Sequence, residues 1–78
     1  MFGQRLRSVR MKRKLTQQRM ADLLSISLNG YQKYEQSERF PPPDCLVQIA
    51  DILQVPIDYL LGRDAFLESL GVSAEKLP

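Results

Sequence analysis

Residues 16–36 read TQQRMADLLSISLNGYQKYEQ, and this stretch holds two points at which a helix is expected to begin. Thr16 and Ser27 each carry a side-chain oxygen that can accept a hydrogen bond from the backbone N–H groups of a first helical turn. We therefore expect one helix from Thr16 to about Leu24 and another over residues 28–36. The turn that ends at Ser27 is so short that the two helices must cross at a steep angle, as in a helix-turn-helix motif.

The second of these helices has an inward side and an outward side. Tyr31 and Tyr34 lie three positions apart and are expected to point into the molecule, while the small Ala21 lets the two helices approach closely. An α-helix fits the major groove of B-DNA, where Asn, Gln and Lys side chains pair with adenine or guanine edges and an apolar side chain contacts the thymine methyl group. The alternative is that the outward face is simply solvated. That face comprises Leu28, Asn29, Gln32, Lys33 and Gln36.

Helices are also expected on both sides of this pair. Apolar side chains recur every three or four positions over residues 2–13, which predicts a first helix there. Three successive prolines, Pro41–Pro43, exclude a continuous helix through residues 37–44 because they lack a backbone donor and disfavour helical geometry in the preceding residue. Asp44, or a residue beside it, is expected to cap a fourth helix. The apolar stripe of that helix is Leu46, Ile49, Ala50 and Leu53.

The rest of the chain is also helical in pattern. Pro56 is tolerated at the start of a fifth helix that ends at Gly62, and Asp64–Leu70 is a candidate for a short additional helix. The last residues, through Pro78, are expected to be frayed. No segment alternates with a period of two residues. The expected fold class is therefore all-α, a compact bundle of five short helices with a possible short extra C-terminal helix.

Composition indicates one folded domain and excludes several kinds of function. The chain has 78 residues, of which 44% are apolar and 26% charged. No apolar run is long enough to span a membrane and no signal-peptide pattern opens the chain, so we expect a cytoplasmic protein. The absence of histidine and the single Cys45 predict no catalytic residue, no metal site and no cofactor, and hence no enzyme. Nothing suggests a small-molecule ligand, and Cys45 is expected to be a small, partly buried helix residue.

Charge is distributed unevenly along the chain. Residues 1–39 carry nine basic and three acidic side chains, a net charge of +6, whereas residues 40–78 carry two basic and six acidic ones, a net charge of −4. Such segregation favours one surface that attracts a polyanion and another that does not. A well-charged, solvated small domain is the other interpretation.

Residues 3–62 resemble the phage repressor/Cro-type, XRE-like helix-turn-helix family. The stretches that carry the resemblance are GQRLRSVRMKRKLTQQRMADLLSIS, the following YQKYEQSER, and IADILQVPIDYLLG. The resemblance implies a lambda-repressor-like DNA-binding domain over residues 1–62 and a C-terminal extension, residues 63–78, that is a dimer contact or a frayed tail. It also implies a sequence-specific double-stranded DNA-binding transcriptional regulator, with repression as the expected mode of action.

The resemblance assigns roles to individual residues. The helix expected over residues 28–36 is the one that family members insert into DNA, and we call it the reading helix. Arg10 and Glu35 match a partly buried salt bridge between the first helix and the end of the reading helix. Arg39 matches a phosphate contact in the loop after that helix. Gln17 matches a residue that binds a backbone phosphate and braces the reading helix, and Gln36 and Ser37 are possible further phosphate contacts. The positions that family members use against base edges are Leu28, Asn29, Gln32 and Lys33.

Three positions depart from the family pattern. Ser25 stands where the turn usually has glycine, so we expect backbone strain at a positive φ. Gly30 interrupts the reading helix, at a cost of about 1 kcal/mol relative to alanine. Tyr31 replaces a branched aliphatic residue, and its hydroxyl group needs a hydrogen-bond partner or access to water. With Leu28 and Gly30 both lacking polar side-chain atoms, DNA shape is expected to carry part of the specificity.

A homodimer on a pseudo-palindromic operator is expected. One small module buries only about 600–1,000 Å² of protein surface on DNA, whereas a twofold pair presents two reading helices about 34 Å apart. The apolar stripe of Phe66, Leu67 and Leu70 is either such a dimer contact or packed within its own chain. The alternative function, from a different class, is an antitoxin or regulatory adaptor whose main partner is another protein.

Overall fold

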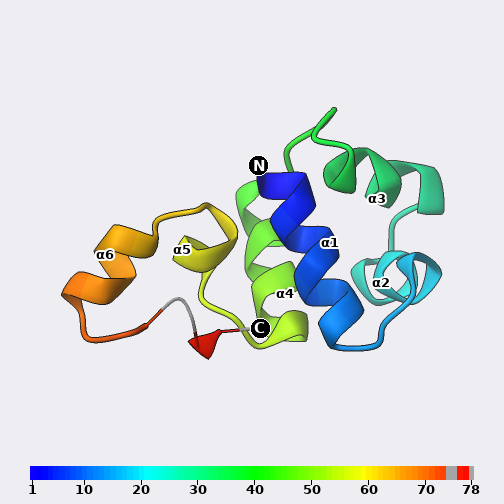
Figure 1. Ribbon diagram of the computed structural model, residues 1–78. Coiled ribbons are helices and arrows are strands. Elements are labelled where there is room, and N and C mark those ends of the chain that lie inside the picture. Colours follow the sequence, from blue (N-terminus) through cyan, green and yellow to red (C-terminus); the bar gives the residue numbers. More distant parts are fainter. Residues whose placement is uncertain (74–75, 78) are drawn as a thin grey trace.

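Six helices follow one another along the residues that the computed structural model describes, residues 1–73 and 76–77 (Figure 1). No strand occurs in these residues, so the all-α prediction with an extra C-terminal helix is confirmed. The expected fraying at the C-terminus concerns in part residues 74–75 and 78, which lie outside the described residues. The helices are α1 (Phe2–Lys12), α2 (Gln17–Leu24), α3 (Leu28–Glu35), α4 (Pro43–Leu53), α5 (Ile57–Leu60) and α6 (Asp64–Ser69).

The two helix starts around the central turn lie where the sequence predicts them. Thr16 Oγ1 accepts a hydrogen bond from the Arg19 backbone N–H at 3.0 Å, and Ser27 Oγ accepts one from the Gly30 N–H at 3.0 Å. Ser25 closes α2 in the left-handed region with φ 56°, as its position predicts. The helix α3 ends at Glu35, one residue earlier than expected, because the next residue serves as its C-cap.

The expected cap of α4 was wrong. The helix begins at Pro43, with Pro42 as N-cap and no side-chain hydrogen bond at that end. Proline suits the first helical position because the N–H group it lacks has no partner inside the helix there. Asp44 instead lies within the first turn, where its charge faces the positive end of the helix dipole.

The hydrophobic core joins the first five helices. Tyr31 and Tyr34 point inward as predicted, with Tyr31 fully buried and their rings packed edge to face at 6.4 Å. Ala21 is fully buried on α2, the helix that packs against α3. The remaining buried apolar residues are Leu6, Val9, Met20, Leu24, Leu46, Ile49, Ala50, Leu53, Val55 and Leu60.

The molecule is 37 Å long in its largest dimension. The short helix α6 lies at the opposite end of it from α2 and α3 (Figure 1). Its apolar stripe is split, because Leu67 is buried while Phe66 and Leu70 are 39% and 62% exposed. Arg5 of α1 ties the start of α6 to the bundle through a hydrogen bond of 2.6 Å to Asp64 Oδ1.

A glycine allows the N-terminus of α1 to meet the C-terminus of α3. A Cβ atom at Gly3 would lie 2.6 Å from the carbonyl carbon of Glu35 and 2.7 Å from Ser37 Oγ, closer than side chains allow. The Gly3 N–H group donates a hydrogen bond of 3.1 Å to Ser37 Oγ. A residue after α3 therefore satisfies a backbone donor in the first turn of α1, where the helix has no side-chain cap of its own.

Candidate nucleic-acid interface

The outer side of α3 is open along its length. Asn29 and Gln36 are exposed, and Leu28, Gln32 and Lys33 are partly buried. The opposite side of the helix is buried through Tyr31 and Tyr34. The structure thus brings the predicted base-reading residues together on one accessible face, supported from behind by the core.

A buried carboxylate fixes this helix to its two neighbours. Glu35 accepts hydrogen bonds from Arg10 Nε at 2.6 Å and from Arg10 Nη2 at 3.3 Å, so α1 holds the end of α3 through a two-point ion pair. The Tyr31 hydroxyl group donates a further bond to the same carboxylate, and the Gln17 amide of α2 donates another at 3.0 Å. Three helices therefore meet at one charge. The hydroxyl group of Tyr31, the residue that departs from the family pattern, thus has Glu35 as its hydrogen-bond partner.

The electrostatics of this cluster favour the ionised carboxylate. Burial by itself raises the pKa of Glu35, but the hydrogen bonds donated by Arg10, Tyr31 and Gln17 outweigh it, so that this pKa lies below its ordinary value. Burial, together with the hydrogen bond to Glu35, raises the pKa of Tyr31. The hydrogen bond to Glu35 raises the pKa of Arg10. The cluster is a fixed ion pair and supplies no proton donor or acceptor for catalysis at neutral pH.

Gln17 lies between this buried cluster and the outer face of α3. Its amide nitrogen donates to Glu35, and its amide oxygen accepts a hydrogen bond of 3.1 Å from the Gln32 amide nitrogen. Gln17 is partly buried at the first position of α2, so one hydrogen of its amide nitrogen remains for another acceptor.

The other predicted phosphate contacts lie where α3 ends and in the loop that follows. Gln36 and Arg39 are exposed, and neither side chain takes part in a hydrogen bond with the described part of the chain. Ser37 is exposed as well, but its oxygen already accepts the Gly3 N–H bond, which leaves its hydroxyl hydrogen available. All three residues are therefore accessible, at the C-cap of α3 and in the loop that follows it.

Three basic side chains of the N-terminal half form hydrogen bonds to other helices or to the ends of helices in the same chain. Arg5 binds Asp64, and Arg10 binds Glu35. Arg13 donates to the carbonyl oxygens of Leu53 at 2.7 Å and Gln54 at 3.3 Å, where its charge also suits the negative end of α4. No local pattern marks Arg13 for this role. The other basic residues of the N-terminal half take part in no ion pair of residues 1–73 and 76–77; they are Arg7, Lys12, Lys14, Arg19, Lys33 and Arg39.

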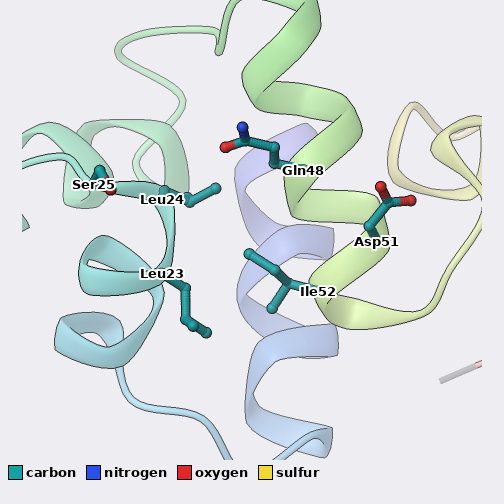
Figure 2. A pocket seen from close by; sticks show the side chains of 6 residues that line it. All are labelled: Leu23, Leu24, Ser25, Gln48, Asp51 and Ile52. Carbon is teal, nitrogen blue, oxygen red and sulfur yellow. The ribbon is translucent and has the colours of Figure 1, made fainter.

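An open hollow of about 330 Å³ lies between side chains of α2 and α4 (Figure 2). Leu23 of α2 and Ile52 of α4 border it, and Gln48 and Asp51 provide polar groups on the α4 side. Ser25 also lines the hollow, but no hydrogen bond among the described residues joins its hydroxyl group to Asp51, so the lining shows neither a nucleophile with its base nor an acid–base pair. In the described residues, no group of three or more Cys, Asp or Glu side chains is placed to hold a metal ion. No described helix is long and apolar enough to cross a membrane.

Cys45 is partly buried on α4, with its Sγ atom 4.0 Å from the Tyr34 hydroxyl oxygen. Burial raises the pKa of this thiol, which disfavours the reactive thiolate. The residue is therefore part of the packing between α3 and α4.

Comparison with known proteins places this arrangement among regulators. A family model described as a helix-turn-helix domain matches residues 1–60. The chain is 46% identical over 65 residues to an uncharacterized HTH-type transcriptional regulator, YqaE, of Bacillus subtilis, covering 83% of this chain and 56% of the relative. It is 52% identical over 48 residues to the cryptic phage CTXphi transcriptional repressor RstR of Vibrio cholerae, covering 62% and 43% of the two chains. The chain thus spans about half the length of the curated relatives it matches.

A solved structure shares the fold. The crystal structure of the P22 c2 repressor protein in complex with a synthetic operator superposes with a TM-score of 0.73 at 30% sequence identity. The match covers 77% of this chain and 91% of the repressor chain.

Proposed function

The chain belongs to the helix-turn-helix domain family, and we propose that it is a sequence-specific double-stranded DNA-binding transcriptional regulator that acts as a repressor. The observation that carries the proposal is the accessible polar face of α3, presented by a helix whose other side is buried and whose end is held by Arg10. An α-helix held in this way enters the major groove as a rigid body. Repression follows from occupancy, because a bound repressor excludes polymerase from the site.

Residues 1–62 form the DNA-binding unit in this proposal. Asn29, Gln32 and Lys33 direct their polar groups to adenine or guanine edges, and Leu28 contacts a thymine methyl group. Phosphate groups are bound by Gln17 at the start of α2 and by three exposed residues at and after the end of α3, which are Gln36, Ser37 and Arg39.

We further propose that the protein binds a pseudo-palindromic operator in the cytoplasm as a homodimer. A single module of this size buries too little surface for selective binding, whereas two modules read two half-sites about 34 Å apart. The extension over residues 63–78 supplies contact area, because Phe66 and Leu70 expose apolar surface while Leu67 anchors α6 to its own chain.

Selection of bound duplexes from a random pool tests this function. Enrichment of a pseudo-palindromic sequence supports the proposal and gives the half-site spacing. Weak binding to all sequences that is abolished by moderate salt, together with tight capture of a protein partner, would instead support the antitoxin or adaptor function.

A further inference from the structure

The hydrogen bond between Gln17 and Gln32 joins the buried carboxylate to the reading face. The Gln17 amide has its nitrogen 3.0 Å from Glu35 Oε1 and its oxygen 3.1 Å from the Gln32 nitrogen. Gln32 is itself partly buried on the outer side of α3. A continuous path of hydrogen bonds therefore runs from Arg10 and Glu35 in the interior to a side chain that faces solvent.

The direction of each amide in this path is fixed by chemistry. An amide group has similar shape in its two flipped orientations but presents a donor in one and an acceptor in the other. An ionised carboxylate accepts hydrogen bonds and cannot donate one. Gln17 must therefore turn its nitrogen to Glu35 and its oxygen to Gln32, and Gln32 must in turn direct its nitrogen to Gln17.

This constraint leaves a defined pattern on the outward side of Gln32. Its amide oxygen makes no hydrogen bond with the described part of the protein, and its nitrogen keeps a second hydrogen. In the major groove adenine offers a 6-amino donor next to the N7 acceptor, which matches an amide oxygen beside an N–H group. Guanine offers two acceptors, N7 and O6, and the O6 atom would meet the amide oxygen.

We propose that the Glu35–Gln17–Gln32 relay makes Gln32 a reader of adenine that discriminates against guanine, with Gln17 as its positioning residue. The inference rests on the proposed function, because it assigns the base that one side chain of the reading face recognises. It also gives Gln17 a role besides its phosphate contact, since the amide that reaches the phosphate also orients the neighbouring reader.

The first test uses the wild-type chain on its selected operator. Gln32→Ala identifies the base pair that Gln32 contacts as the position at which preference is lost. At that position we expect guanine, or a purine that lacks the 6-amino group, to weaken binding by about tenfold or more relative to adenine. Tolerance of guanine within about twofold, or Gln32→Ala leaving every position unchanged, would overturn the relay.

A variant pair then tests the positioning role. Gln17→Met removes the amide at similar size and frees Gln32 to flip, so adenine-over-guanine preference at that position should fall to within about threefold. Gln18→Met is the matched control, because Gln18 is exposed on the same helix and bonds only Asp22; its preference should equal that of wild type. The lost phosphate contact lowers affinity for all sequences alike and leaves preference unaffected.

The outcomes separate the two proposals. If the wild-type chain enriches no sequence, the proposed function fails and the relay fails with it. If it enriches an operator and Gln17→Met, folded by circular dichroism, keeps the full preference, only the relay is refuted. If Gln17→Met does not fold, the analogue duplexes with wild-type protein decide the direction of the Gln32 amide.

Discussion

Lys33 and Arg39 both offer a positive charge at the reading face, and we expect them to contribute differently. Lys33 projects from α3 itself, so Lys33→Ala should cost about 1–3 kcal/mol on the preferred operator and relax preference at one base pair. Arg39 lies in the loop after α3, so Arg39→Ala should weaken all sequences alike and reduce the salt slope by about one. Gel-shift titrations at several salt concentrations measure both effects.

The two variants serve as controls for one another. An equal loss on every duplex for Lys33→Ala would remove it from the base readers. An unchanged salt slope for Arg39→Ala would remove it from the phosphate contacts.

Gly3 is the residue whose replacement should damage the fold most directly. A methyl group there would collide with the backbone of Glu35, so Gly3→Ala is expected to lower the free energy of unfolding by about 2–3 kcal/mol in spite of the better helix propensity of alanine. Urea denaturation measures the change. Ser8→Ala, at an exposed position of α1, is the control and should change stability by less than about 0.5 kcal/mol. Equal stabilities of the two variants would show that α1 and α3 tolerate a wider separation.

At the scale of elements, the joint between α2 and α3 holds strain that a single change should relieve. Ser25 has φ 56°, a conformation that costs a non-glycine residue on the order of 1 kcal/mol. Ser25→Gly is therefore expected to raise the free energy of unfolding by about 0.5–1 kcal/mol. The same substitution at Ser27, whose backbone is extended and whose hydroxyl caps α3, should lower it by a few tenths. Thermal unfolding of both variants checks the opposite signs.

The helix α6 and its C-cap residue, Leu70, expose the apolar surface that we propose as a dimer contact. Leu70→Ser should weaken self-association at least about tenfold, and with it cooperative binding to the two half-sites, because a leucine side chain at a contact is worth roughly 1.5–3 kcal/mol. Sedimentation on operator DNA measures the stoichiometry. Val47→Ser, which replaces an exposed apolar residue on α4, is the matched control. Loss of association in both variants, or in neither, would place the contact elsewhere.

Local signals in the sequence were sufficient to predict most helices and their inward faces. The caps Thr16 and Ser27, the positive φ at Ser25 and the buried pair Tyr31 and Tyr34 follow from short-range rules. The start of α4 was misjudged because a proline was sufficient to begin the helix without a side-chain cap, so the acidic residue was not needed as one.

Long-range contacts were not predictable from local patterns. Arg13 bonds the end of α4, and Ser37 bonds the start of α1, at sequence separations that only packing brings together. The Arg10–Glu35 pair came from family resemblance, since no spacing rule connects those positions. The close approach of α1 to the backbone of Glu35 at Gly3 was likewise not predicted from the sequence.

For the whole molecule, stability and acidity should be linked through the buried carboxylate. The pKa of Glu35 is lower in the folded than in the unfolded chain, where it is about 4.3. Its contribution is therefore fully present above about pH 4.3 and is lost as the pH falls through the lower, folded value. Glu35→Gln should lower the free energy of unfolding at pH 7 by about 3 kcal/mol, and this difference from wild type should shrink below about pH 4.

Urea denaturation between pH 7 and pH 3 follows this difference. Glu38→Gln, at an exposed loop position that takes part in no ion pair of the described chain, is the control and should parallel wild type over the range. A Glu35→Gln deficit that stays constant down to pH 3 would contradict the linkage.

The helices α2 and α3 occupy one end of the molecule and α6 the other, with α1 and α4 between them (Figure 1). The N-terminal half contributes +6 and the C-terminal half −4. Under the proposed function, we expect the basic N-terminal half to contribute most of the attraction to the negatively charged duplex.

The residues on the outer face of α3 differ in how strongly they are bound to the rest of the fold, and this difference affects how such proteins can diverge. Leu28, Asn29 and Lys33 take no part in the side-chain hydrogen bonds that hold the described helices together, whereas Gln32 is bound to its neighbours. Under the proposed function, we expect mutations at those three sites to have little effect on folding, so that a lineage can acquire new target sequences there. Gln32 is the exception, and descendants that change it must also adapt Gln17.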